Sequence, residues 1–454
     1  MFKYICAVLM LLFIQLSVYA DDTTITTCDF TSLSDAFTRI NVNGGAITID
    51  CDGTILIPFH FVIRKDVVIE ATGELILDGE GESLFFLVSE GASLTVKNIT
   101  FQNGNGLDGG AIINNGTLSI ENSRFINNQS TQGGAIFNQG IVTISDSEFV
   151  DNSVSIEGTS EFYGGAIFSF GEGELTVNNT RFIGNEANYG GAIAIISSSL
   201  TISDSYFENN IAQLYGGAIL QYQGLITITD TQFVGNQSAD GGAISASDTF
   251  LNLSGSQFTA NVASVRGGAL VIAPETRVSI LNSTFSENRA DDEGGVIYSM
   301  GQITIVNSTF WDNHAALGDV LYNIGTDVYT ASAVIQHSTL VNGDETDESA
   351  LIHSGEYSGV GLFATIISDT HEVCSGTEGI IADATNLASH ACGEAQVVED
   401  MMLGEFDGTV ISLLPNSPAI DFYPTPCVAL SDQLDTSRPQ GAGCDAGAVE
   451  LPIE

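Results

Sequence analysis

The chain is built on a repeated pattern of short apolar stretches that polar or glycine-rich corners separate. In the unit that begins at Gly133, Gly-Gly-Ala-Ile precedes the apolar–polar–apolar triplet at 142–144, and Phe149 and Asn152 follow. The phenylalanine recurs about every 25 residues, at Phe101, Phe125, Phe149, Phe182, Phe207, Phe233, Phe258, Phe285 and Phe310. A period of this length is typical of solenoid proteins, in which each unit forms one coil.

The apolar triplets predict β-strands whose first and third residues face inward. The Ala-Ile dipeptide after the glycines and the phenylalanine predict two further short strands in each unit, and the repeats show no helical periodicity. One unit cannot bury its apolar face alone, so successive coils must stack with strands about 4.8 Å apart. We therefore predict an all-β fold, a single right-handed three-sheet parallel β-helix.

Stacked coils bring equivalent residues into columns. The phenylalanines form one column, and a second contains Asn128, Asn152, Asn185, Asn210, Asn236, Asn261, Asn288 and Asn313. Stacked asparagine amides satisfy one another and the backbone of a bend, and paired glycines fit a corner that needs positive φ or close backbone approach. Because these residues recur in nearly every coil, we interpret them as structural and not catalytic.

The two ends of the chain depart from the repeat. Residues 1–20 have a lysine, an apolar run and a small-residue cleavage site, as in a secretory signal peptide. Residues 21–43 predict an N-terminal cap, an amphipathic helix that buries Leu33, Ala36, Phe37 and Ile40, with Ser32 or Ser34 as N-cap. We assign 44–370 to the β-helix and the Pro- and Cys-containing residues 371–454 to a C-terminal cap.

Six cysteines remain after the leader, and all lie outside the regular coils. An even number in an exported chain predicts disulfides. Six cysteines allow fifteen connectivities, and segregation at the two ends favours Cys28–Cys51, Cys374–Cys392 and Cys427–Cys444. Zinc is the weaker alternative, because the chain contains no C-x-x-C pair.

Charge narrows the range of partners. The chain has 11 Lys and Arg against 56 Asp and Glu, a formal net charge of −45. Such a field disfavours nucleic acid, anionic membranes and polyuronates. The apolar run of the leader is too short to span a membrane convincingly, so we expect a secreted monomer with no membrane span after cleavage.

The motifs together resemble those of a family of bacterial exported proteins, the right-handed parallel β-helix proteins with polymorphic-outer-membrane-protein-type repeats (GGAI with FxxN). The segment at Cys28 and 32–37 is similar to the family's C-S-L-R-E-A cap, and 444–450 reads C-D-A-G-A-V-E, similar to its C-D-x-G-A-x-E cap. The resemblance implies a β-helix over the mature chain. For function, it implies a secreted or surface protein, adhesin-like in some members.

Enzymes that cleave polysaccharides also use β-helices, and their chemistry requires particular residues. A lyase needs calcium-binding carboxylates beside an Arg or Lys, and a hydrolase needs converging carboxylates. Lysine occurs only at Lys65 and Lys97 after the leader, and the arginines are scattered. Asp146 shares its repeat register with Asn122 and Asn179, which indicates a role in the turn. No catalytic residue stands out.

Four other features of the sequence bear on ligand binding. The six histidines do not have the spacing of a metal site. The acidic segments 291–293 and 344–348 are candidate calcium loops, but they lack the consensus G-G-x-G-x-D. We therefore favour solvated acidic loops and no cofactor. The inserted residues 154–163 form a loop that could bind or simply be tolerated. Outward Thr and Ser side chains around Thr143, Thr201 and Thr227 form a flat hydroxyl array suited to a periodic surface.

Together these observations predict a non-catalytic, adhesin-like scaffold that binds an extracellular glycan or surface. The alternative is a polysaccharide lyase or glycoside hydrolase of the pectate-lyase type.

Overall fold

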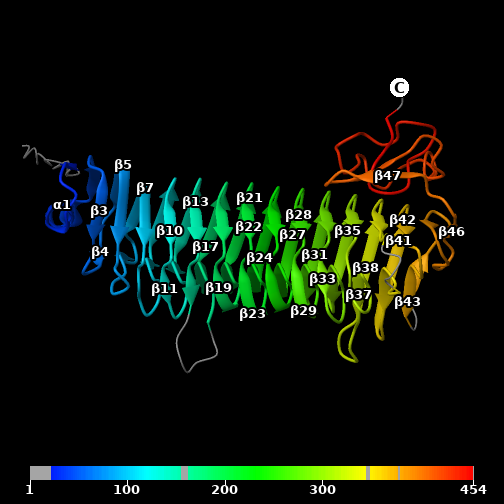
Figure 1. Ribbon diagram of the computed structural model, residues 1–454, viewed down its shortest axis with the longest axis horizontal. Coiled ribbons are helices and arrows are strands. Elements are labelled where there is room, and N and C mark those ends of the chain that lie inside the picture. The colour runs from blue at the N-terminus through cyan, green and yellow to red at the C-terminus, as the bar shows by residue number, and fades with distance from the viewer. Residues whose placement is uncertain (1–21, 155–161, 344–347, 377–378, 453–454) are drawn as a thin grey trace, which may run out of the picture.

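The computed structural model describes residues 22–154, 162–343, 348–376 and 379–452. Over these residues the chain forms a right-handed parallel β-solenoid of about 14 turns with one helix at its N-terminal end (Figure 1). The prediction of an all-β parallel β-helix is confirmed. The expected leader, 1–20, and most of the inserted loop, 155–161, lie outside the described residues.

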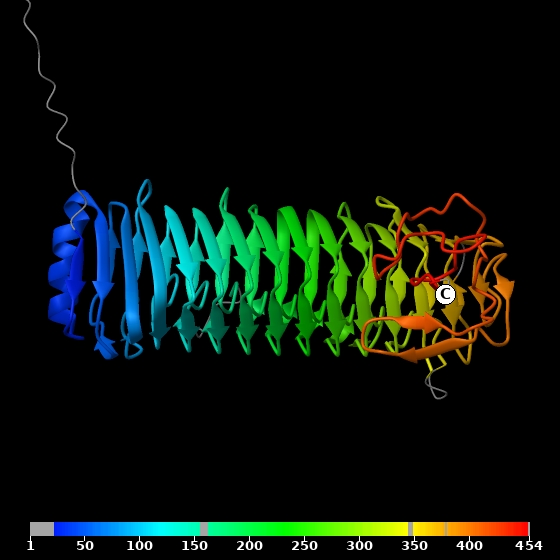
Figure 2. The ribbon, with the colours of Figure 1, turned by 90° about the horizontal axis from the view of Figure 1, so that it is seen from above.

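Three parallel columns of strands run along the solenoid, as Figure 2 shows from above. Column 1 follows the paired glycines and contains β4 (Phe61–Ile63), β6 (Phe86–Val88), β8 (Ile112–Asn114), β12 (Ile136–Asn138), β16 (Ile167–Phe170), β20 (Ile193–Ile196), the first halves of β24 (Ile219–Thr229) and β27 (Ile244–Ser254), β30 (Leu270–Ile272), β34 (Ile297–Ser299), β37 (Leu321–Asn323), β40 (Ile352–Ser354) and β43 (Cys374–Gly376).

Column 2 holds the apolar triplets. It contains β1 (Thr23–Ile25), β2 (Gly45–Ile49), the first halves of β5 (Val67–Asp78) and β7 (Ser93–Gln102), β9 (Thr117–Glu121), β13 (Ile141–Ser145), β17 (Glu174–Asn178), β21 (Ser199–Ser203), the second halves of β24 and β27, β31 (Arg277–Leu281), β35 (Gln302–Val306), β38 (Ala331–Gln336), β41 (Ser358–Phe363) and β44 (Ile380–Ala382).

Column 3 holds the phenylalanines. It contains β3 (Gly53–Leu56), the second halves of β5 and β7, β10 (Arg124–Ile126), β14 (Glu148–Val150), β18 (Arg181–Ile183), β22 (Tyr206–Glu208), β25 (Gln232–Val234), β28 (Gln257–Thr259), β32 (Thr284–Ser286), β36 (Thr309–Trp311), β39 (Thr339–Val341), β42 (Ile366–Ser368), β45 (Leu387–Ala388) and β46 (Gln396–Val397).

The middle coils also carry a short fourth strand that the sequence analysis did not anticipate. Column 4 contains β11 (Gln129–Ser130), β15 (Ser153–Val154), β19 (Glu186–Tyr189), β23 (Ile211–Tyr215), β26 (Gln237–Asp240), β29 (Val262–Arg266) and β33 (Arg289–Ala290). These segments have no extended apolar alternation, because in most of them a single small residue faces inward, such as Ala187, Ala212 or Ala263.

The core confirms that equivalent side chains stack from coil to coil. From Phe101 to Phe310, neighbouring ring centroids lie 4.6–4.9 Å apart with nearly parallel planes. Each ring is completely buried. Burying one such side chain contributes about 1.5–3 kcal/mol, so the stack is a main source of the stability of the rod.

The asparagine column has the structural role predicted for it. From Asn128 to Asn288, each Nδ2 donates to the Oδ1 of the next asparagine at 2.9–3.0 Å. The same Nδ2 also donates to a phenylalanine carbonyl, for example from Asn152 to Phe125 at 2.9 Å. A buried bend would otherwise leave these backbone groups unsatisfied, at a cost of about 1–3 kcal/mol each.

The glycine pairs are needed for two different reasons. Gly133 has φ of 64°, in the left-handed region, which favours glycine. Gly134 does not, but a Cβ there would overlap the carbonyl oxygen of Gly165 in the next coil. The corner therefore excludes side chains at both positions.

Helix α1 (Phe30–Asn43) covers the N-terminal end and buries the predicted face, Leu33, Ala36, Phe37 and Ile40. The choice of Ser32 or Ser34 as N-cap is wrong. Asp29 is the N-cap, and its carboxylate accepts a hydrogen bond from the Ser32 backbone N–H at 2.8 Å. Aspartate competes well for this position because its charge also favours the helix N-terminus. No helix in the described ranges is long and apolar enough to cross a membrane.

The segment 371–454, expected to form the C-terminal cap, divides into two parts in the structure. Strands β43 to β46 continue the parallel ladder past residue 370, as far as Val397. The residues that follow, 399–452, leave the axis and lie along the side of the last coils (Figures 1 and 2). We call this part the lateral segment, and it contains the antiparallel pair β47 (Leu403–Phe406) and β48 (Ile411–Leu413).

Candidate functional site

The outward face of column 3 differs between its two ends. The first residue of each strand points away from the core, and this position reads Arg124, Glu148, Arg181, Tyr206, Gln232 and Gln257 over the open coils. The next three coils carry Thr284, Thr309 and Thr339, which are buried beneath the lateral segment. The open half is therefore the part of this face available to a ligand.

A groove of about 690 Å³ lies at the N-terminal end of the open half. We call it the Arg124 groove. Columns 2 and 3 meet at this edge, so several coils contribute to its lining, which consists of residues 73–76, 98–100, 122–124, 146–148, Asn179 and Arg181. Its size falls within the range of known small-ligand sites, about 300–1,000 Å³.

Charged side chains alternate along the floor of the groove. Arg124 Nε lies 2.8 Å from a carboxylate oxygen of Glu148, and Arg181 approaches the other oxygen at 3.8 Å. Arg181 also lies 3.8 Å from Glu208 and 5.5 Å from the ring centroid of Tyr206. The pKa of Tyr206 is raised by burial and by Glu208, with Arg181 opposing.

These ion pairs contribute little to folding. Both arginine side chains are 55% exposed, and exposed pairs are worth about 0–1 kcal/mol. Only Nε of Arg124 is used at short range, so its remaining guanidinium donors point toward solvent or a ligand. A row of arginine donors and carboxylate acceptors at fixed spacing suits a ligand with many hydroxyl groups.

The polar corner beside the groove is structural, as predicted from the Asn and Asp that share its register. Asn122, Asp146 and Asn179 have φ of 47°, 51° and 44°, a conformation that Asn and Asp tolerate better than other side chains. Asn179 Nδ2 donates to Asp146 at 2.6 Å. This contact occupies one oxygen of the only carboxylate in the corner of these three coils.

Neither the arginines of the groove nor the neighbouring Lys97 is available as a proton-abstracting base. Arginine is not deprotonated in proteins. Lys97 is on the adjoining coil of column 2, but it lies 2.6 Å from Glu121, and the hydrogen bond and charge of Glu121 raise its pKa. Lys97 therefore stays protonated at neutral pH.

The covered half is held by hydrogen bonds from the lateral segment to the threonine row. The Gln433 side chain accepts from Thr309 Oγ1 at 2.7 Å and donates to Thr284 Oγ1 at 2.9 Å. Thr284 Oγ1 donates to the Thr409 carbonyl at 2.6 Å, and Thr339 Oγ1 accepts from the Ala448 N–H at 2.9 Å.

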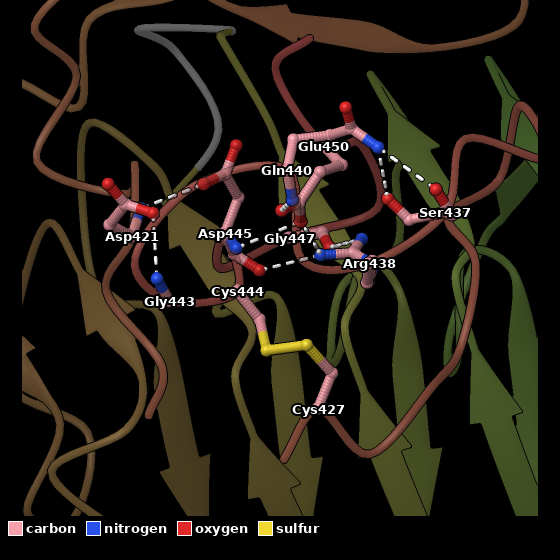
Figure 3. The surroundings of a disulfide bond; sticks show 10 residues. All are labelled: Asp421, Cys427, Ser437, Arg438, Gln440, Gly443, Cys444, Asp445, Gly447 and Glu450. Carbon is pink, nitrogen blue, oxygen red and sulfur yellow. Dashed lines mark hydrogen bonds and ion pairs between the residues drawn. A yellow bond between two sulfur atoms is a disulfide. The ribbon is translucent and has the colours of Figure 1, made fainter. Parts of the chain in front are cut away.

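The lateral segment is organised around a buried ion pair, which Figure 3 shows beside the Cys427–Cys444 disulfide. Arg438 Nη1 lies 2.9 Å from Glu450 and also donates to the Asp445 carbonyl at 2.7 Å, and both charged side chains are almost fully buried. The Glu450 carboxylate also accepts from the Gln440 and Asp445 backbone N–H groups. Burial of this kind is tolerated because nearly every polar atom is satisfied.

The cysteines form Cys28–Cys51, Cys374–Cys392 and Cys427–Cys444, with Cα atoms 5.8, 5.4 and 5.8 Å apart. Cys28 and Cys51 link the region of α1 to the first coils, and Cys392 is buried at the other end of the core. These disulfides lie away from the Arg124 groove.

The other predicted positions do not gather into a metal site. Among the described residues no group of three or more His, Cys, Asp or Glu could hold a metal ion. In the acidic loop at 291–293, Asp291 lies 3.4 Å from Arg289, and most of the loop at 344–348 lies outside the described residues. The histidines are dispersed: His337 is buried, His353 stacks on Tyr322 and His314 lies 3.7 Å from Asp312.

The residues of the predicted hydroxyl array occupy equivalent positions on successive strands of column 2. Ser119, Thr143, Thr176, Thr201, Thr227, Asn252, Ser279 and Thr304 pair in succession on its outward face. It is separate from the Arg124 groove, since it faces outward from column 2.

Comparison with known proteins supports the fold. Residues 85–258 match the family model described as "Right handed beta helix region", and 282–300 match the Chlamydia polymorphic membrane protein repeat. A comparison with curated proteins gave no match. The matches support a right-handed β-helix family of proteins.

Solved structures that show some similarity to this chain include two polysaccharide lyases and a phage protein. A mannuronic acid specific family 6 lyase from human gut microbiota is 9% identical, with a TM-score of 0.40 over 81% of this chain and 86% of its own. Alginate lyase AlyF-OU02 is 12% identical, with a TM-score of 0.42 over 95% and 97%. Tailspike protein 3 of bacteriophage CBA120 is 11% identical, with a TM-score of 0.35 over 78% and 58%.

The Arg124 groove was not predicted from the sequence. Its signal was present, because Arg124 and Arg181 both stand directly before the column phenylalanine, with Glu148 at the same position between them. Arg124 and Arg181 look scattered along the sequence, but the coil period aligns them on one face.

Proposed function

We propose that the protein is a secreted, non-catalytic β-helix scaffold that binds an extracellular glycan through the Arg124 groove. The observation that carries the proposal is the row of Arg124, Glu148 and Arg181, partly exposed charged groups that a rigid ladder fixes in line along a groove. Such a row is prepared for a long, polyhydroxylated chain lying parallel to the solenoid axis, because little ordering is required on binding.

Charge indicates which glycans fit. Glu74, Asp146 and Glu148 line the groove with Arg124 and Arg181, within a chain of net charge −45. The groove therefore has no excess of positive charge, which favours a neutral glycan over a polyuronate. The disulfides and the polymorphic membrane protein repeat fit an extracellular or surface location.

The alternative, a polysaccharide lyase or hydrolase acting at the same groove, rests on its combination of arginines and carboxylates. The ion pair that keeps Lys97 protonated speaks against a lyase base at this edge. The turn position of Asp146 speaks against its use as a general acid.

A glycan array with and without calcium tests binding, and reducing-sugar and unsaturated-uronate assays on the same glycans test cleavage. We expect binding without turnover. The double variant Arg124→Ala/Arg181→Ala should weaken binding by about tenfold or more, since two charge-assisted contacts are lost. Arg289→Ala, an exposed arginine of column 4, is the matched control and should have no effect. Turnover of any glycan, or equal binding by the double variant, would refute the proposal.

A further inference from the structure

A second hollow lies near the C-terminal end of the solenoid, on a different face from the Arg124 groove. It has a volume of about 820 Å³ and is lined by residues 330–332, 355–359 and Gly379. These residues come from β38, β41 and their flanking turns. It therefore continues the outward face of column 2, on which the threonine and serine array runs.

Gly359 of β41 opens this hollow, and a second glycine, Gly361, follows it on the outward face of the same strand. The outward positions of column 2 read Gln302, Ser332 and Gly359 along one line, and Thr304, Val334 and Gly361 along the next. The outward side chain of the preceding coils is thus missing at Gly359, whereas Phe363 lies against Gly361 and Ile381 continues that row in β44. The result is a step in an otherwise filled surface.

The backbone does not require glycine at 359. Its φ lies outside the left-handed region, and a Cβ built there would have its nearest neighbour, the Gly379 carbonyl oxygen, at 3.6 Å, an ordinary contact. Glycine inside a strand costs about 0.5–1 kcal/mol relative to alanine. Such a residue often marks a place where a ligand or another backbone approaches closely, and here the space in front of it is open.

One wall of the hollow is an exposed aromatic side chain. Tyr357 is 56% exposed, and its turn is fixed because its carbonyl accepts from the Ala331 N–H at 3.2 Å. The exposed Glu356 and the hydroxyl groups of Thr330 and Ser332 also line the hollow. Within the described part of the chain these two hydroxyls make no hydrogen bond, so both can donate to and accept from a ligand.

We propose that this hollow, the Tyr357 site, binds neutral sugar units. The flat ring of Tyr357 suits the apolar C–H face of a pyranose, as amphipathic aromatics suit surfaces that are half apolar and half polar. Thr330, Ser332 and Glu356 then offer donors and acceptors to the sugar hydroxyls. No Lys or Arg is among the residues that line the hollow, and Glu356 repels anions, so a uronate is disfavoured.

The Tyr357 site is independent of the Arg124 groove. Roughly seven coils separate β13 from β38, which at ~4.8 Å per coil places the two sites about 34 Å apart along the axis. Because the two sites lie on different faces, they can hold separate glycan chains of one polysaccharide network. The second binding event is then intramolecular, which raises the overall affinity.

The test uses the full chain and neutral hexasaccharides of β-1,4-glucose, β-1,4-mannose and α-1,4-glucose, with a hexauronate as anionic probe, in titration calorimetry and saturation-transfer NMR. Tyr357→Asn removes the ring but tolerates the left-handed turn, where φ is 53°, and should weaken neutral-sugar binding by about tenfold. Gly359→Val fills the hollow with a good strand former and should abolish binding at this site while leaving the melting temperature equal or higher. Gly359→Ala, which adds only one methyl group, should have a smaller effect.

Two controls separate this proposal from the groove. Tyr222→Thr removes another exposed tyrosine, 44% exposed in β24, and should change nothing. Arg124→Ala should leave NMR contacts at Tyr357 intact even if it abolishes binding elsewhere. The inference fails if none of the neutral probes contacts Tyr357, if Tyr357→Asn and Gly359→Val both bind as the wild type does, or if the hexauronate binds this site more tightly than the neutral probes.

Discussion

The open and covered halves of column 3 share a backbone but meet different surroundings. Phe125 pairs with Phe149 in the open half, and Phe285 pairs with Phe310 in the covered half, in the same register. The outward residue before the phenylalanine is charged or long in the open half and threonine in the covered half. The outward position before the phenylalanine therefore differs between the half that carries the lateral segment and the half that remains open.

The physical reason is the cost of desolvation. Threonine has one hydroxyl, which a single partner can satisfy, as Gln433 does for Thr309. Burying Arg124 or Arg181 under the same segment would require a paired carboxylate with good geometry or cost several kcal/mol. The comparison indicates that the small outward threonines allow the lateral segment to pack on the covered half, whereas the charged outward residues of the open half disfavour such packing.

The largest expected effect is a loss of stability in the covered half. Arg438→Met would leave Glu450 as an uncompensated buried charge and should destabilise the lateral segment by about 3–5 kcal/mol. Hydrogen exchange should then increase at Thr284, Thr309 and Thr339 but not in the Phe149 coils. Arg289→Met, an exposed arginine, is the control with little effect. If exchange increases along the whole rod, the segment is not an independent unit.

Acid should loosen the same half. Burial, and secondarily the charge of Arg438, lowers the pKa of His337 to about 3 from 6.5, and its ring lies 5.7 Å from that of Tyr423 beneath the lateral segment. Because the unfolded state binds the proton first, this stability is complete above pH 6.5 and is lost as the pH falls toward 3. At about 1.4 kcal/mol per pH unit, pH 4.5 should cost roughly 2–3 kcal/mol.

Asp445 opposes this trend, because burial raises the pKa of its carboxyl. Comparison of the wild type with His337→Asn cancels the contribution of Asp445, which is present in both proteins. Asparagine is chosen because it tolerates the φ of 44° at this position. Hydrogen exchange of the lateral segment between pH 7 and 4.5 should be much less pH-dependent in this variant. An equal dependence in both proteins would show that His337 is not the group responsible.

A smaller loss should follow from Gln433→Ala. This change leaves the buried hydroxyl groups of Thr284 and Thr309 without their shared amide partner, at a cost of about 1–2 kcal/mol. Denaturant unfolding followed at the lateral segment measures it. Gln440→Ala, whose amide bonds only the exposed Ser437, should be near neutral. Equal effects of the two variants would contradict the docking role of Gln433.

The smallest effect on stability is expected in the open half. Glu148→Gln removes the charge between Arg124 and Arg181, yet the exposed pairs should cost no more than about 1 kcal/mol and less at high salt. Glycan binding at the Arg124 groove should change more than the melting temperature does. A large loss of stability would mean that the charged row serves folding and not recognition.

The regular coils could be predicted because each coil repeats the same pattern of residues. Repetition of Phe and Asn at one period leaves only stacking as a way to bury the phenylalanine and satisfy the amide. The N-cap of α1 was not predicted, because Asp29 and Ser32 both favour that position and only the path of the chain into the helix selects between them. Column 4 was missed because a strand with one small inward residue has no apolar period to detect.

The sequence by itself determined the parallel β-helix, its column of aromatic rings and its glycine corners, because these depend on periodic residues that act the same way in every coil. Only the tertiary structure decided that 399–452 lies along the side of the rod, that Arg124, Glu148 and Arg181 line one groove, and that Gly359 faces open space. Those features depend on how distant parts of the chain meet, and no local period records which outward positions will be covered and which will be left to a ligand.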